Sequence, residues 1–155
     1  MTNMTSENNS ALTVIISFAD KLNSFARTRL NKELNEYGLK FNQWRLIHAI
    51  SSKAIYTPAK LADELMIERA TVSRYLDQLE ERDCIERSHN NFDRRVVDLK
   101  LTEKGKEVAK LGIELMDDAY KNMFSDFSSN ENKHFVTLIK KLNDSIPEEK
   151  AYSVR

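Results

Sequence analysis

The feature that most constrains the fold is a stripe of apolar residues at helical spacing across residues 10–37. A helix over this range is roughly 40 Å long, so the core of so short a chain cannot cover it all. Part of the stripe is therefore expected to pack on a second chain, and Gly38 is expected to end the helix because glycine accepts left-handed backbone angles. The stripe comprises Leu12, Ile15, Ile16, Ala19, Leu22, Ala26, Leu30 and Leu34, with Phe25 on its flank.

Three shorter helices are predicted next. The first covers residues 42–51, and the second begins at Thr57-Pro58, because threonine is a good N-cap and proline suits the first helical position. The third covers residues 69–82. Its predicted inner face consists of Val72, Leu76 and Leu79.

The hydrophobic period then changes from that of a helix to that of a strand. Residues 85–88 and 97–101 are predicted to form a hairpin with a charged tip, since apolar and polar residues alternate in the second run. Two more apolar helices are predicted, over residues 103–127 and 131–145, separated by Ser128-Ser129-Asn130.

This order of elements predicts a mainly α fold with a minor β part, a winged helix-turn-helix with long N- and C-terminal dimerisation helices. We expect the compact winged module at residues 42–102, dimerisation helices at 10–37 and 103–146, and flexible tails at 1–9 and 147–155.

Composition limits the location and the cofactors. The single cysteine, Cys84, allows no intrachain disulfide, and the polar N-terminus is a poor secretory signal, so a cytoplasmic protein is expected. No apolar run is long enough for a membrane span. The three histidines, His48, His89 and His134, lie in different predicted elements without short ligand spacing, so no metal or other cofactor is expected.

Charge complicates a nucleic-acid hypothesis. The chain has 24 basic and 24 acidic residues, and residues 57–104 hold nine Lys and Arg against eleven Asp and Glu, a net charge of −2. Basic side chains must therefore be presented together while acidic ones point elsewhere.

The outer face of the predicted helix over residues 69–82 carries small, hydrogen-bonding and basic residues. Small side chains permit close approach to a major groove, and arginine can bind a guanine edge or a phosphate. The alternative interpretation is an ordinary amphipathic helix with a solvated face. The candidate DNA-binding residues here are Arg69, Ala70, Thr71, Ser73 and Arg74.

The hairpin tip carries Asp93-Arg94-Arg95. A narrow minor groove attracts inserted arginine, and an aspartate can hold the guanidinium in place. We therefore expect Asp93, Arg94 and Arg95 to bind DNA, although a solvated turn with surface charges is the alternative.

The motifs together resemble the MarR family of bacterial regulators. They are Leu61-Ala62-Asp63-Glu64-Leu65, Ala70-Thr71-Val72-Ser73-Arg74, Leu79-Glu80-Glu81-Arg82, and the run from Asp93 through Leu101-Thr102-Glu103-Lys104-Gly105. The resemblance implies a homodimer that binds imperfect palindromes in double-stranded DNA, with a recognition helix in the major groove and a wing in the minor groove. It also implies that Thr71, Ser73 and Arg74 contact DNA, that Arg95 is the wing arginine, and that Asp93 orients it.

Three positions depart from the pattern of that family. Met66 and Asp83 stand where glycine is usual, and Glu68 stands where Ser or Asp often caps the recognition helix. Aspartate tolerates left-handed angles and the charge of Glu68 suits a helix N-terminus, so only small local changes are expected.

The resemblance also suggests a small aromatic or other effector. A cleft beside the second helix often holds it in such proteins, which makes Trp44, Arg45 and His48 weak candidates for ligand contact. Cys84 is interpreted as a small half-buried hydrophobe, with a thiol switch as the alternative.

The leading hypothesis is a transcriptional regulator, more often a repressor, that a small molecule or stress signal releases from a pseudo-palindromic operator. A winged-helix protein-interaction module without DNA binding and a constitutive architectural DNA binder are the alternatives. No motif of an enzyme is present.

Overall fold

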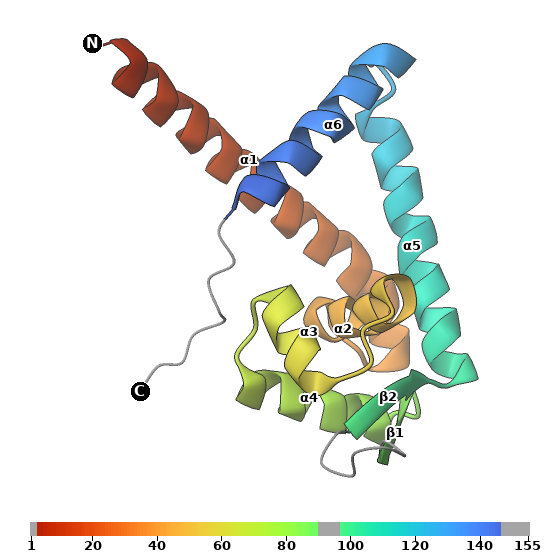
Figure 1. The fold of residues 1–155 in the computed structure, drawn as a ribbon. Coiled ribbons are helices and arrows are strands. Elements are labelled where there is room, and N and C mark those ends of the chain that lie inside the picture. The colour runs from red at the N-terminus through yellow and green to blue at the C-terminus, as the bar shows by residue number, and fades with distance from the viewer. Residues whose placement is uncertain (1–2, 90–96, 147–155) are drawn as a thin grey trace. The chain divides into compact units, whose positions relative to one another are not determined.

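The structure is a computed structural model that describes the backbone of residues 3–89 and 97–146 and the side chains of residues 11–89 and 97–146. The chain divides into two compact units, residues 1–41 and 42–155, and each is described separately below. The first unit is dominated by one helix, α1 (Asn3–Leu34), which continues into a 3-10 turn, η1 (Asn35–Tyr37) (Figure 1).

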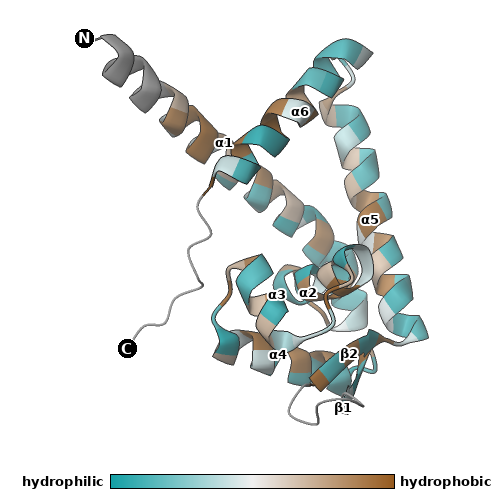
Figure 2. Ribbon diagram, in the orientation of Figure 1, coloured by the Kyte–Doolittle hydropathy of each residue, from teal (hydrophilic) through white to brown (hydrophobic). Residues whose placement is uncertain are grey.

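The exposure of the apolar side chains changes along helix α1. Leu12, Ile15 and Ile16 are exposed, whereas Leu30 and Leu34 are fully buried. Figure 2 shows a brown, apolar stretch on the ribbon of α1 directly after its grey first turns. The expectation that this stripe exceeds what one chain covers is therefore confirmed for the described residues.

The second unit contains the remaining elements, whose order agrees with the sequence-based prediction. They are α2 (Phe41–Lys53), α3 (Pro58–Leu65), α4 (Arg69–Glu81), β1 (Ile85–His89), β2 (Val97–Leu101), α5 (Glu103–Met123) and α6 (Ser129–Ser145). The predicted fold class, a mainly α winged helix-turn-helix with long terminal helices, is confirmed.

The last two helices differ in their bounds from the prediction. Helix α5 ends at Met123, four residues before the predicted Phe127, and α6 begins at Ser129 rather than Glu131. The start of α6 is set by a capping box: the Ser128 hydroxyl accepts from Glu131 N, and the Glu131 carboxylate accepts from Ser128 N. The segment 124–128 is thereby the turn between the helices.

The core of this unit lies where α2, α3, α4 and the hairpin meet. Each of these elements contributes apolar side chains that are almost completely buried, so α4 is fixed from its inner side. They include Leu46, Ile47, Leu61, Ala62, Val72, Leu76, Leu79, Ile85 and Leu99.

Three helices end in the same backbone arrangement. An amide after each end donates back to a carbonyl five residues earlier: Leu39 to Leu34, Ile67 to Ala62, and Cys84 to Leu79. The residues at the left-handed position are Gly38 (φ 66°), Met66 (φ 54°) and Asp83 (φ 56°). Glycine stops the first helix as predicted, and the two departures from glycine keep the left-handed backbone.

The wing is an antiparallel pair in which Ile85 is opposite Leu101 and Arg87 is opposite Leu99. The other edge of β2 is also held, because Leu99 N donates to Tyr56 O at 2.8 Å. Thr102 joins the wing to α5: its amide donates to Cys84 O at 3.2 Å, and its hydroxyl donates to Asp83 O at 2.6 Å. Within the described residues, no helix has the length and hydropathy that a bilayer span requires.

Candidate nucleic-acid interface

Helix α4 presents the predicted face to solvent. Burial of Val72, Leu76 and Leu79 leaves the opposite side outward, because each residue advances about 100° around the axis. On that side Arg69, Ala70, Ser73 and Arg74 are exposed, and Thr71 is half-buried. The structure thus brings these five side chains to the N-terminal half of one helix.

Arg74 has a neighbour that orients it. Its guanidinium carbon lies 5.7 Å from the centroid of the Tyr75 ring, within the range of a cation–π contact. The Tyr75 hydroxyl in turn accepts from Asn42 Nδ2 at 3.5 Å, which ties the ring to α2. The position of Arg74 is therefore linked to the helix behind it.

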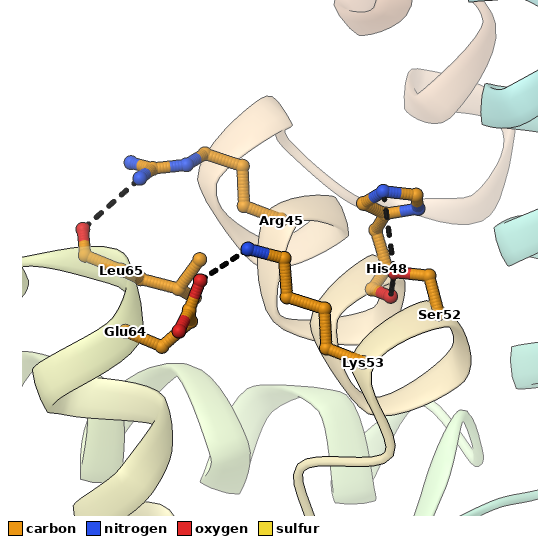
Figure 3. A network of polar contacts seen from close by, with 6 residues as sticks. All are labelled: Arg45, His48, Ser52, Lys53, Glu64 and Leu65. Carbon is orange, nitrogen blue, oxygen red and sulfur yellow. Dashed lines mark hydrogen bonds and ion pairs between the residues drawn. The ribbon is translucent and has the colours of Figure 1, made fainter. Parts of the chain in front are cut away.

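Helix α2 positions α4 and the turn before it by side-chain contacts. Gln43 Nε2 donates to Gln78 Oε1 at 2.7 Å, directly between α2 and α4. At the end of α3, Arg45 Nη2 donates to Leu65 O at 3.0 Å, and Lys53 forms an ion pair with Glu64 (Figure 3). The C-terminus of α3, where the turn into α4 begins, is thereby held by two cations of α2.

The N-terminus of α4 lacks a side-chain cap. Glu68 occupies the N-cap position, and its side chain accepts no capping hydrogen bond. The departure at Glu68 therefore leaves out the capping hydrogen bond that Ser or Asp can supply at this position. Exposed amides at such a terminus can bind an anion, which is compatible with a phosphate at this end of α4.

The C-terminal half of α4 is acidic. Arg87 of β1, which the sequence analysis did not single out, forms ion pairs that offset part of this negative charge. Arg87 Nη2 lies 2.7 Å from Asp77 Oδ1, and Arg87 Nε lies 3.4 Å from Glu80 Oε2. The only sequence signal for this pairing was the alternation in β1, which places Arg87 on the same face as the buried Ile85.

The predicted wing residues Asp93, Arg94 and Arg95 lie outside the described residues. Their place in the fold is limited only by the strands that flank them, which end at His89 and begin at Val97. Their contacts with DNA stay predictions.

The three weak ligand candidates diverge in the structure. Trp44 is buried and stacks on His48, with ring centroids 4.9 Å apart, whereas Arg45 points to Leu65 (Figure 3). Burial and the nearby Lys53 ammonium lower the pKa of His48 below its usual value. A ligand contact therefore stays a prediction, and Arg45 does not join the other two side chains.

Cys84 is fully buried, and its thiol donates to Arg82 O at 3.7 Å. Burial raises the pKa of this thiol above its usual value, although the Lys104 ammonium opposes the shift. Within the described residues, no three His, Cys, Asp or Glu side chains gather as they would around a metal ion.

Comparison with known proteins places this geometry among regulators of one family. A family model described as MarR family matches residues 39–97. The uncharacterized HTH-type transcriptional regulator YwhA of Bacillus subtilis is 35% identical over 79 residues, which are 51% of this chain and 57% of that protein. The chain covers 57% to 65% of the length of this and other curated relatives, one of which is named as a transcriptional repressor in Escherichia coli.

Two solved structures extend the likeness to most of the chain. A MarR/EmrR family regulator from Acinetobacter sp. ADP1 is 28% identical with a TM-score of 0.71, and the match covers 88% of this chain and 94% of that one. A mutant MarR of Escherichia coli in complex with operator DNA is 23% identical with a TM-score of 0.68, covering 85% and 95% of the two chains. The second likeness shows the fold alone.

Proposed function

We propose that this chain is a homodimeric, sequence-specific DNA-binding regulator of transcription of the MarR family, whose model matches residues 39–97. It acts as a repressor on a pseudo-palindromic operator. The observation that carries the proposal is the outer face of α4, where Arg69, Ser73 and Arg74 are exposed beside the small side chain of Ala70. The relatives named above are regulators rather than enzymes.

Exposed apolar side chains support the homodimer. On α6, Leu138, Ile139 and Leu142 are 63%, 44% and 40% exposed, and a single soluble helix rarely leaves such a stripe in water. In the other unit, the exposed side chains of Leu12, Ile15 and Ile16 on α1 also need a partner surface. A second copy of the chain supplies apolar surface of the same kind, and two-fold symmetry matches a palindromic site.

The proposal extends to an effector and to the cytoplasm. A small aromatic molecule that enters this part of the fold would contact the stacked rings of Trp44 and His48, because the His48 side chain is half-buried rather than fully covered. The alternative, a winged-helix module that docks protein instead of DNA, is supported by the net negative charge of residues 57–104.

The test is a selection of random duplex DNA on the purified full chain, followed by sequencing of the bound fraction. We expect an enriched inverted repeat with half-sites about one helical turn apart. Absence of any enriched sequence would contradict a sequence-specific regulator and would favour the protein-docking alternative.

Two substitutions then test the contacts on the selected site. Arg74→Ala in α4 and Arg95→Ala in the wing are each expected to weaken specific binding by about 1–3 kcal/mol and to leave the dimer intact. Lys106→Ala is the control, because it removes one exposed cation on α5, outside the proposed DNA contacts. Fluorescence anisotropy gives the affinity, and light scattering gives the oligomeric state.

A further inference from the structure

We propose that Arg87 is a positioning residue for DNA recognition: it ties the carboxylates of Asp77 and Glu80 to the wing and so prevents them from opposing DNA at α4. This role rests on the proposed DNA-binding function. It concerns a strand residue that is expected to touch no base, and it explains how a module of net negative charge presents a basic surface.

The geometry shows one guanidinium serving two carboxylates. Arg87 Nη2 donates to Asp77 Oδ1 at 2.7 Å, and Arg87 Nε lies 3.4 Å from Glu80 Oε2, close enough for an ion pair although not aligned as a hydrogen bond. The Arg87 side chain is 26% exposed, against 57% for Asp77 and 46% for Glu80. The arginine is thus the more buried partner, and the carboxylates are on the solvent side.

The fold places Arg87 there for a local reason. In the antiparallel wing, Arg87 is directly opposite Leu99 and two residues from Ile85, and both of those side chains are buried. The alternation of β1 therefore sends the Arg87 stem towards the core side of the wing, where the guanidinium reaches α4. Because Asp77 and Glu80 are three residues apart, they lie on neighbouring turns of one helix side and can share it.

The order of charges along α4 explains why this contact would favour binding of an anion. Arg69 and Arg74 lie in its first half, whereas Asp77, Glu80 and Glu81 lie in its second half. Asp77 follows Arg74 by three positions, the spacing at which a carboxylate and a guanidinium pair on a helix surface. Without Arg87, Asp77 would repel phosphates and would also compete for the Arg74 guanidinium.

Two other roles for Arg87 predict different energetics. If Arg87 itself bound a phosphate, its loss would cost the same whether or not the carboxylates are present. If Arg87 only stabilised the wing, its loss would reduce affinity to the same degree at all salt concentrations. Charge compensation alone predicts a loss that depends on the carboxylates and weakens as salt screens the field.

The experiment is a double-mutant cycle on the full chain, with the DNA site obtained from the selection described above. Affinities are measured by anisotropy from about 0.05 M to about 0.5 M salt for wild type, Arg87→Ala, Asp77→Asn/Glu80→Gln and the triple variant. Arg87→Lys keeps the charge, and Lys106→Ala is the control for loss of an exposed, ion-paired cation on α5. Circular dichroism checks that each variant is folded.

We expect Arg87→Ala to weaken binding roughly tenfold at low salt, with the defect shrinking as salt rises. In the Asp77→Asn/Glu80→Gln background, the same substitution is expected to change affinity less than about threefold, and Arg87→Lys should also stay within about threefold of wild type. Lys106→Ala should bind as wild type does.

Equal losses in both backgrounds would overturn the proposal in favour of a direct phosphate contact. A loss that stays the same at all salt concentrations would reduce Arg87 to a structural role. Failure of the wild type to bind any duplex would overturn the proposed function itself, and this result is distinguishable because it precedes every variant.

Discussion

The junction between the wing and α5 leaves no room for a methyl group at Gly105. A Cβ atom there would lie 2.0 Å from the carbonyl oxygen of Cys84 and 3.0 Å from its carbonyl carbon. The obstacle is backbone, so rotation of a side chain cannot relieve it. We therefore expect Gly105→Ala to push the first turn of α5 away from β1.

The cost follows from the contacts that this movement breaks. Overpacking alone costs about 1–3 kcal/mol, and the amide and hydroxyl of Thr102 stand to lose hydrogen bonds to Cys84 O and Asp83 O, each contributing about 1 kcal/mol. The higher helix propensity of alanine returns at most about 1 kcal/mol. The expected net loss in the free energy of unfolding is about 2–4 kcal/mol.

Urea denaturation followed by circular dichroism, at one fixed protein concentration, measures this loss. Lys106→Ala in the same helical turn is the matched control and should change the free energy of unfolding by less than about 0.5 kcal/mol. A second variant, Gly105→Ala with Cys84→Ala, should show no rescue, because the clash is with the Cys84 backbone. A loss below about 0.5 kcal/mol for Gly105→Ala would refute the argument from the junction.

Two further predictions concern titratable groups. The lowered pKa of His48 means that folding favours the neutral imidazole over the charged one, so this contribution to stability is present above a pH of about 6.5 and is lost as the pH falls below that value. The urea midpoint should drop between pH 7.5 and 5.5 by less in His48→Gln than in wild type, and equal drops would contradict this. Cys84 combines full burial with a raised pKa, so iodoacetamide should label it much more slowly in the native chain than in urea. Labelling at the same rate in both states would show that the thiol is accessible.

The fold was largely predictable because its local patterns are strong. Thr57 accepts from Lys60 N as an N-cap should, Gly38 adopts a left-handed conformation, and Val72, Leu76 and Leu79 are the buried side of α4. Each of these follows from chemistry within a few residues. The end of α5 was predicted too late, because the capping box at Ser128 determines where α6 begins but not where the preceding helix stops.

The candidate site was less predictable, since it depends on contacts between elements. The face of α4 follows from its period, but the pairing of Arg87 with Asp77 depends on how the wing packs, which no spacing encodes. The contacts of Arg45 also depend on packing between elements. Arg45 shares a helix with Trp44 and His48, but position 45 lies about 100° around the helix axis from Trp44. The DNA contacts of Asp93, Arg94 and Arg95 stay predictions because these residues lie outside the described part of the chain.

The left-handed residues Met66 and Asp83 have a consequence for how such a chain can change over generations. A side chain at positive φ costs conformational energy that glycine avoids, so a change to glycine in the turn before or after α4 would stabilise the fold. Met66 is also 63% exposed, so a change to glycine there would remove little packing. One such substitution would raise the free energy of unfolding, and this increase would offset a destabilising change on the outer face of α4. The specificity of that face is therefore free to diverge further than the stability of the present sequence alone would permit.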